Sequence, residues 1–356
     1  MKIKSASDSD QSRLTLILGA PRSGTTWLAK IFDSHPDVLY RHEPDLVVPD
    51  NRIPSICADE NAPELIEAAR GFVADLMHTH TLKTAGSLPV FPKRHDRPWT
   101  RVGRTAAIVS LRLVQKTIGL DPRRRIVFLD HFDRDNDPSS HVVLKSISAL
   151  GRAGLFAEAL PEARIILIMR HPFGQIASRL DGLARGKLLD ARPFKELTSI
   201  PEARRFGLSD ERLRNLPPVE QMAWEWAILH EKAYADLSGR PNATMLRYAD
   251  LVADPLARAR ALFAFAGLPW HVATERFIRT STSYGGPDWY FDVRKQGLTP
   301  LHKWRKILSA ADQARIAAIV RNTSVGQLWP DYFSAPERAT PLWPTEVRLQ
   351  AGASAP

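Results

Sequence analysis

Residues 14–33 read LTLILGAPRSGTTWLAKIFD and combine an apolar run, a turn with two glycines and the start of a helix. Residues 14–18 predict a buried strand. Residues 19–26 predict a loop whose backbone N–H groups and helix N-terminus hold an anion. The nucleoside-triphosphate version of this loop carries a lysine where Thr25 stands here, and the cation of this loop, Arg22, precedes the second glycine. The loop therefore predicts an anion site that is unsuited to a γ-phosphate and its magnesium.

Further apolar runs alternate with helical patterns along the chain. They predict strands at residues 38–40, 125–129, 142–145, 165–169 and 245–248. Helices are predicted at residues 63–77, 105–119, 150–159, 172–185, 218–237, 255–266 and 309–322. This alternation predicts an α/β fold: a P-loop-type parallel β-sheet with helices on both faces and helical and loop insertions. In such sheets ligands lie beyond the carboxyl ends of the strands, where Lys145 and Arg170 fall.

The composition indicates a globular protein with an anionic ligand or partner. Of its 356 residues 44% are hydrophobic, and the formal net charge is +10. Such a charge favours an anionic small ligand, an acidic substrate or a nucleic acid. The single cysteine, Cys57, excludes an intrachain disulfide and fits a reducing compartment. Residues 1–13 show no secretory signal and no run of about 18 apolar residues occurs, so we expect a cytoplasmic protein.

A second strand–turn–helix unit follows at residues 165–180, IILIMRHPFGQIASRL, with Arg170 after the strand and Ser178 in the helix. In order and spacing, this unit and residues 14–33 resemble the sulfotransferases that use 3′-phosphoadenosine-5′-phosphosulfate (PAPS), in particular bacterial, carbohydrate-directed members. The resemblance covers roughly residues 14–310. It implies an enzyme that moves a sulfuryl group from PAPS, its cosubstrate, to an acceptor hydroxyl. It also implies adenosine 3′,5′-bisphosphate (PAP) as the product, and no metal.

The resemblance assigns roles to single residues. It implies that Arg170 and Ser178 hold the 3′-phosphate, and that the 5′ side and the adenine are held by Arg22, Ser23, Gly24, Thr25, Thr26 and Trp27. Tyr248, in LRYADLVADP at residues 246–255, is similar to a family tyrosine near the adenine, although Ala249 replaces the family's acid. For Trp27 and Tyr248 the alternative is a place in the hydrophobic core.

A fourth stretch agrees loosely with the family pattern. Residues 294–297, RKQG, and then KWR at residues 303–305 are similar to the family's R-K-G…W-K segment, which closes over the 3′-phosphate. The resemblance thus implies a role for Arg294 and Lys295. The glycine is displaced by one residue and the gap to the tryptophan is longer, so a solvated basic turn is the alternative.

Sulfuryl transfer needs cations at the leaving oxygen and a base for the acceptor hydroxyl, and no step demands a metal. Arg22 suits the bridging and sulfate oxygens because its planar fork holds two oxygens at once. Lys145, at a strand end, either reaches the sulfate from the opposite side or extends into solvent.

The general base is predicted from two solutions used in the family. Phenol and steroid sulfotransferases use a histidine two residues after such a lysine, but here that position is Ile147. Carbohydrate-directed members use a glutamate at the distance past the P-loop cation where Glu43 lies. We expect Glu43 to be the base. His42 is the second candidate and His131 is the third. The alternative is that Glu43 only caps or pairs with Arg41.

We expect one sulfotransferase-like α/β domain over residues 14–332. Residues 1–13 are predicted to be disordered, residues 45–140 to be an insertion that binds the acceptor, and residues 333–356 to be an extended tail. The predicted acceptor is a carbohydrate, a glycolipid or a small metabolite. The sequence leaves the oligomeric state open.

Two other functions remain open from the sequence. A nucleotide or small-molecule kinase would use the same loop, but it needs the loop lysine and a magnesium-binding acid, for which Asp130 is the candidate. A chelator would stop such a kinase and spare a sulfotransferase. A non-catalytic binder of nucleic acid or acidic glycan would use the positive charge, but the chain contains no nucleic-acid-reading motif. Steeply salt-dependent DNA binding without affinity for PAP would favour that binder.

Overall fold

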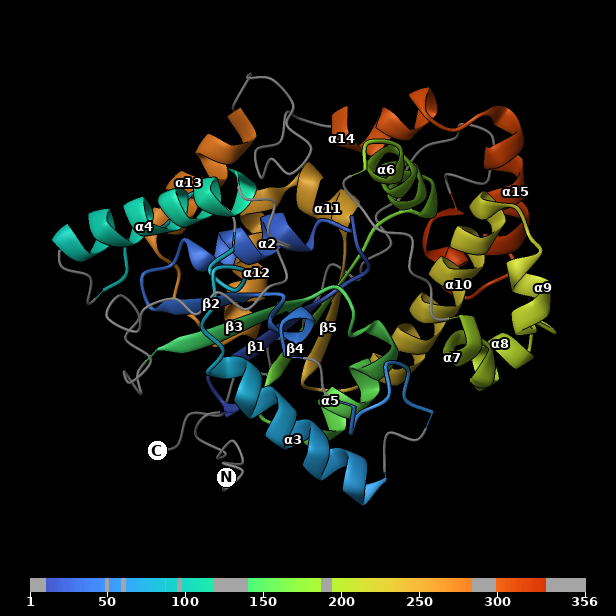
Figure 1. The fold of residues 1–356 in the computed structure, drawn as a ribbon, viewed down its shortest axis with the longest axis horizontal. Helices are drawn as coiled ribbons and strands as arrows, with labels where there is room; N and C mark the ends of the chain where they lie inside the picture. The colour runs from blue at the N-terminus through green and yellow to red at the C-terminus, as the bar shows by residue number, and fades with distance from the viewer. Residues whose placement is uncertain are drawn as a thin grey trace, which may run out of the picture.

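The structure, a computed structural model, describes residues 11–48, 51–58, 62–86, 88–94, 98–117, 140–186, 194–283 and 299–330. In these residues one parallel sheet runs in the order β2-β3-β1-β4-β5 (Figure 1). Its strands are β1 (Leu14–Leu18), β2 (Val38–His42), β3 (His141–Ser146), β4 (Arg164–Met169) and β5 (Ala243–Arg247). The predicted α/β class is confirmed.

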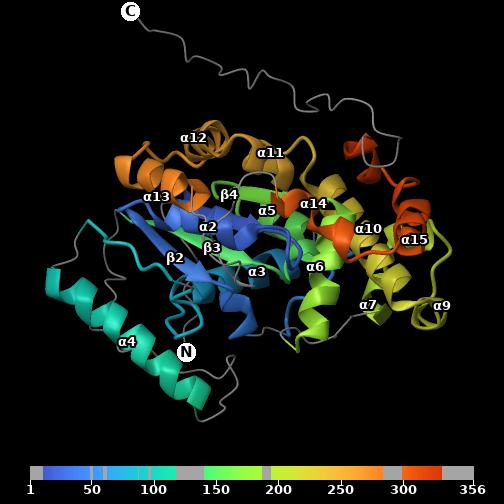
Figure 2. The same ribbon diagram turned by 90° about the horizontal axis from the view of Figure 1, so that it is seen from above.

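Helices cover both faces of the sheet (Figures 1 and 2). One face is covered by α2 (Thr25–Asp33), α11 (Tyr248–Ala253), α12 (Pro255–Phe265) and α13 (Val272–Ser283). The other face is covered by α3 (Pro63–Met77), α5 (Ala153–Ala159), α6 (Pro172–Ala184), α10 (Pro218–Leu237) and α15 (Ala310–Val320). The remaining helices lie outside these layers: α4 (Pro98–Thr117), α7 (Phe194–Ser199), α8 (Pro201–Arg204), α9 (Asp210–Arg214) and α14 (Thr299–His302).

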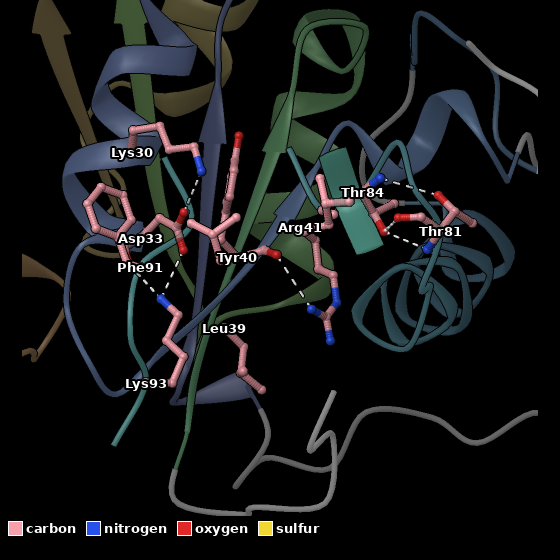
Figure 3. A pocket seen from close by; sticks show the side chains of 12 residues that line it. Lys30, Asp33, Leu39, Tyr40, Arg41, Thr81, Thr84, Phe91 and Lys93 are labelled. Atoms are coloured by element: carbon pink, nitrogen blue, oxygen red, sulfur yellow. Dashed lines mark hydrogen bonds and ion pairs between the residues drawn. The ribbon is translucent and has the colours of Figure 1, made fainter. Parts of the chain in front are cut away.

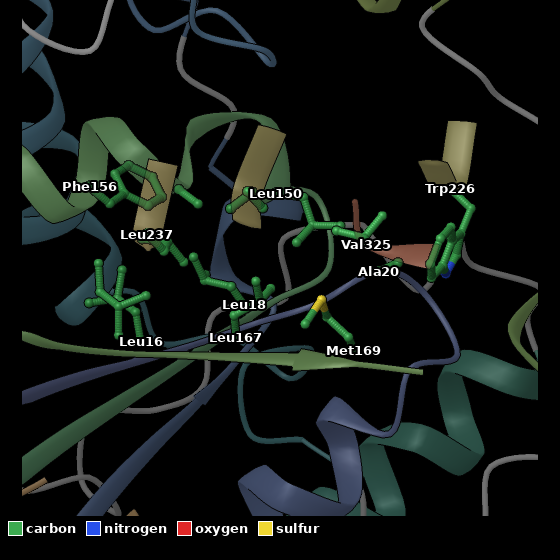
Figure 4. Packing of buried hydrophobic residues seen from close by; sticks show 14 of the residues in the cluster. Leu16, Leu18, Ala20, Leu150, Phe156, Leu167, Met169, Trp226, Leu237 and Val325 are labelled. Atoms are coloured by element: carbon green, nitrogen blue, oxygen red, sulfur yellow. The ribbon is translucent and has the colours of Figure 1, made fainter. Parts of the chain in front are cut away.

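The central strand β1 explains why two cores form. Its alternate residues Leu14, Leu16 and Leu18 pack with α3, α5 and α10, and Ile17 packs with α2 and α12 on the opposite face (Figure 4). All five residues of β1 are buried, as a strand covered by helices on both faces requires. The buried Thr15 hydroxyl is satisfied by His141 Nε2 of the neighbouring strand at 2.8 Å.

Most predicted elements occur with small shifts at their ends. Residues 218–237 form α10 as predicted, but β2 continues past Tyr40 to His42 and α4 begins seven residues before the predicted helix. Tyr248 is not the last residue of a strand. It begins α11, because β5 ends at Arg247. The predicted strand at 125–129 and the predictions for 1–10 and 333–356 lie outside the described residues. No described helix is long and apolar enough to span a membrane.

We expect Leu167→Ala to lower the free energy of unfolding by about 2–5 kcal/mol, because Leu167 of β4 is fully buried in the core shown in Figure 4. The matched control, Leu113→Ala, removes the same atoms from a side chain that is 62% exposed and should change stability by less than about 0.5 kcal/mol. Urea unfolding measures both, and equal effects would contradict the assignment of this core.

Candidate functional site

The carboxyl ends of the five strands meet at one edge of the sheet, and each is next to a predicted site residue or carries one. These are Glu43 after β2, Lys145 in β3, Gly19 after β1, Arg170 after β4 and Tyr248 after β5. Neighbouring strands are about 4.8 Å apart, so the loop after β1 lies about 10 Å along the edge from β2 and about 5 Å from β4. The predicted residues therefore form one row along this edge.

The loop after β1 has an unusual backbone. Arg22 has a φ of 72° and Gly24 a φ of 98°, both in the left-handed region. A Cβ at Gly24 would lie 2.4 Å from a ring carbon of Tyr248, so glycine is needed for packing as well as for backbone conformation. In the described part of the chain Arg22 and Glu43 are the non-glycine residues with positive φ, and both are predicted site residues. Backbone strain of this kind gathers at functional sites.

The N-terminus of α2 offers an anion site. Gly24 is its N-cap without any capping side chain, and the Gly24 carbonyl accepts from Trp27 N at 3.1 Å and Leu28 N at 3.2 Å. The amides of Thr25 and Thr26 belong to the first turn, where the helix itself supplies no acceptor and the dipole is positive. Ser23 Oγ is fully buried in this loop without a hydrogen-bond partner. An oxyanion ligand would satisfy both features.

Arg22 joins the loop after β1 to α6. Its Nε donates a hydrogen bond to Ser178 Oγ at 2.9 Å, and Arg170 Nη1 donates to the backbone carbonyl of Arg22 at 3.1 Å. Gln175 Nε2 of α6 donates to the Pro21 carbonyl at 2.9 Å. The structure thus brings Arg22, Arg170 and Ser178 into contact, so that guanidinium groups from two strand ends share one location.

The two predicted aromatic residues lie beneath this cluster. The Arg170 guanidinium is 5.0 Å from the ring centroid of Tyr248, which is 2% exposed. Trp27 is also 2% exposed, and its Nε1 donates to Ser281 Oγ at 3.3 Å. Both rings therefore lie in the hydrophobic core, which is the alternative that the sequence left open for them. Tyr248 contacts Arg170 and lies where a Cβ at Gly24 would be, and Trp27 packs edge-on against Tyr248.

Glu43 lies in a buried cluster of cations. Its Oε1 contacts Lys145 Nζ, and its Oε2 is 2.6 Å from Lys83 Nζ. The backbone amide of Glu43 donates to the Lys145 carbonyl at 2.8 Å, which extends the β2–β3 ladder to this residue. Arg41, the alternative partner, donates from Nε to the Met77 carbonyl at 3.2 Å. The structure therefore pairs Glu43 with two lysines and places Lys145 beside Glu43 rather than in solvent.

The charges in this cluster set its protonation states. Burial opposes ionisation of Glu43, but the nearby charge of Lys145, with that of Lys83, outweighs it and holds the pKa of the carboxyl well below its usual value. Burial lowers the pKa of Lys145, and Glu43 opposes that shift. Burial and then the charge of Lys145 hold the pKa of His42 well below its usual value. At neutral pH the cluster therefore contains the Glu43 carboxylate and a neutral His42 imidazole beside the two lysines.

His42 connects Glu43 to a pocket at the outer edge of β2. His42 Nε2 is 3.6 Å from Glu43 Oε1, and its Nδ1 shares a 2.6 Å hydrogen bond with Tyr40 Oη. Tyr40 lines the pocket with Lys30 and Asp33, which form a buried ion pair at 2.6 Å (Figure 3). The Tyr40 contact fixes the orientation of the His42 ring relative to Glu43.

One residue of the site carries no sequence signal, and several predicted residues lie outside the described part of the chain. Lys83 pairs with Glu43 across 40 positions, and no sequence pattern marks it. Arg294 and Lys295, predicted for the 3′-phosphate, lie outside the described residues, as do His131 and Asp130. Among the described residues no group of three or more histidine, cysteine or acidic side chains is placed to hold a metal ion.

A protein-family model matches most of the chain. A model described as the sulfotransferase family matches residues 15–272, well over half of the chain. A search of the curated proteins finds no match.

Solved sulfotransferases resemble the chain only distantly. It is similar to the sulfotransferase domain of an olefin synthase from Synechococcus PCC 7002, with 19% identity, a TM-score of 0.40, and coverage of 86% of this chain and 92% of that one. It is also similar to sulfotransferase STF9 from Mycobacterium avium (15%, 0.40, 88% and 77%) and to mouse SULT7A1 complexed with PAP (12%, 0.40, 90% and 88%). These low TM-scores carry no argument about the site, which rests on the geometry and the family model.

We expect Glu43→Gln to lower the free energy of unfolding at pH 7 by about 3 kcal/mol, because Lys145 would stay buried beside a neutral group. The lowered pKa of Glu43 means that its carboxylate stabilises the fold above the unfolded-state pKa of 4.5, and that this stabilisation is lost as the pH falls. The difference from wild type should be full at pH 7 and shrink below about pH 4.5. Urea unfolding from neutral to acidic pH measures it. A difference that is independent of pH would contradict the buried ion pair.

Proposed function

The chain belongs to the sulfotransferase family, and from this premise we propose that it transfers the sulfuryl group of PAPS to a hydroxyl of a carbohydrate, glycolipid or small metabolite. The observation that carries the proposal is the contact between two strand ends. Arg22 Nε reaches Ser178 at 2.9 Å while Arg170 binds the Arg22 carbonyl at 3.1 Å. Cations from two neighbouring strand ends suit a ligand that carries more than one anionic group.

The row of strand ends gives the donor an orientation. The 3′-phosphate of the nucleotide belongs near β1 and β4, where Arg170 and Ser178 would hold it. The 5′ side belongs at the N-terminus of α2, with Ser23, Thr25 and Thr26 as donors. Trp27 and Tyr248 enter this proposal as the support beneath the nucleotide. Arg294 and Lys295 remain proposed as residues that close over the 3′-phosphate.

Glu43 and Lys145 belong at the reacting end. PAPS, when bound, supplies an activated sulfuryl group whose leaving phosphate oxygen gains charge during transfer. Lys145 and Arg22 stabilise negative charge there, one from the β3 side and one from the β1 side. Glu43 accepts the proton of the acceptor hydroxyl at its carboxylate.

The ion pairs of Glu43 affect its strength as a base. A carboxylate held by two lysines is a weak base, because its pKa lies far below neutral. An anionic ligand beside Lys145 would compete with Glu43 for the lysine and so raise the basicity of the carboxylate. Base strength and donor binding are then linked through one ammonium group. His42, neutral and oriented by Tyr40, stays the reserve base.

The acceptor is proposed to approach from the side of Lys83. Lys83 is 24% exposed, whereas Lys145 and Glu43 are nearly inaccessible, so the cluster opens toward the segment at residues 78–86. This segment belongs to the region 45–140 that we predict to bind the acceptor. A carbohydrate or glycolipid hydroxyl remains the favoured acceptor, and a cytoplasmic location and a single domain over residues 14–332 remain proposals.

We expect Glu43→Gln to abolish turnover and to leave the affinity for PAP nearly unchanged, because the carboxylate is proposed to act on the acceptor and not on the nucleotide. The control is Glu231→Gln, which removes a buried, ion-paired glutamate that bonds to Arg205 and to Val325 N instead of the site. The control should be destabilised and still active. Equal loss of turnover and PAP affinity in Glu43→Gln would refute the base assignment.

We expect Arg170→Ala to weaken PAP binding by about 10- to 100-fold, the loss typical of hydrogen bonds to a charged partner. Arg170→Lys should recover part of that loss, because it keeps the charge without the fork. Arg185→Ala, an exposed arginine at the end of α6, is the control and should bind PAP as wild type does. Titration calorimetry measures all three, and unchanged affinity in Arg170→Ala would refute the placement of the nucleotide.

A further inference from the structure

The helix α4 lies at the periphery of the molecule, beyond the edge strand β2, in both views of the fold (Figures 1 and 2). It packs on the body through Ile108, which is 2% exposed and lies in a small cluster with Leu82 and Val90. Arg112 of α4 donates to the Gly86 carbonyl. One face of a 20-residue helix is thus anchored to the segment at residues 82–90.

The opposite face of α4 is apolar and exposed. Val102, Val109 and Leu113 are 64%, 46% and 62% exposed, and Ala106 between them is exposed as well. Their spacing of four, three and four residues puts them in one stripe along the helix. Val114, 51% exposed, widens that stripe. In the described part of the chain, most of the exposed large apolar side chains lie on this one helix.

The charge of α4 indicates which kind of partner can bind the exposed apolar stripe. The helix reads PWTRVGRTAAIVSLRLVQKT, with four basic residues and no acidic one. Arg112 bonds to the body, so a second copy docked stripe to stripe would bring the other three basic residues of each helix together, six cations in all, without a carboxylate from either helix, and repulsion opposes that interface. An anionic lipid surface accepts apolar side chains and basic residues at once. A basic amphipathic helix of this composition is typical of such surfaces.

We propose that α4 docks this protein on an anionic lipid surface, with the stripe of Val102, Ala106, Val109 and Leu113 entering the boundary between headgroups and acyl chains. The helix lies along the surface and does not cross it, in agreement with the absence of a described helix apolar enough to span a bilayer. The proposal does not depend on the reaction, because it involves no residue of the row at the carboxyl ends of the strands.

The test is flotation of the full-length protein with vesicles in the absence of any sulfuryl donor or acceptor. Vesicles of mixed phosphatidylglycerol and phosphatidylcholine should bind the protein at low salt and release most of it at high salt, and pure phosphatidylcholine should bind far less. Leu113→Asp and Val109→Asp should each lower the bound fraction at least several-fold. The control, Val272→Asp, changes a valine that is 66% exposed elsewhere and should bind as wild type does.

Several outcomes would overturn the proposal. These are failure of the wild type to bind anionic vesicles, equal binding by Leu113→Asp and wild type, and a dimer of the wild type that Leu113→Asp dissociates, which would assign the stripe to a second copy. All substituted side chains are exposed, so unchanged melting temperatures check that the variants are folded. Because PAP affinity and turnover are measured separately, failure of lipid binding leaves the proposed sulfuryl transfer untouched, and the reverse also holds.

Discussion

The buried ion pair between Glu43 and Lys145 is the interaction on which the arrangement of the site depends. It joins the ends of β2 and β3, which also share a backbone hydrogen bond at this point, and it draws Lys83 from a distant segment onto the same carboxylate. Burying the charges of Glu43 and Lys145 is tolerable because they compensate each other, whereas Lys83 is partly exposed. The edge strand, the segment at residues 78–86 and the central sheet are therefore held in register by electrostatics as well as by apolar packing.

Residues with strained backbone conformations and the contacts that hold them lie together at this edge of the sheet. Arg22 and Glu43 both adopt left-handed backbone conformations that are costly for residues with a Cβ. Each is held there by neighbours: the Arg22 carbonyl accepts from Arg170, and Glu43 bonds through both its amide and its carboxylate. Side chains that a relaxed turn would direct elsewhere are in this way directed at the ligand region.

Local patterns predict this fold well, and contacts between distant segments limit what they predict about the site. The strand at residues 14–18, the helix at 218–237 and the order of elements follow from apolar periodicity, because each depends on neighbouring residues alone. Lys83 could not be predicted, since its partner lies 40 positions earlier in the sequence. The depth at which Trp27 lies was equally invisible, because it depends on Ser281 of α13 and on Tyr248. The start of α4 at Pro98, seven residues before the predicted helix, does not follow from apolar periodicity.

The order of the strands puts the predicted anion-binding loop and Glu43 at different places in the sheet. The anion-binding loop follows β1 in the middle of the sheet, whereas Glu43 follows β2 at its margin. A marginal strand opens in local fluctuations more readily than a central one, and it tolerates insertions and exchange of its outer contacts. In the proposed function, the rim around β2 can therefore change for new acceptors while the proposed nucleotide site stays intact. Related enzymes built on this plan should diverge most in the segment that covers β2.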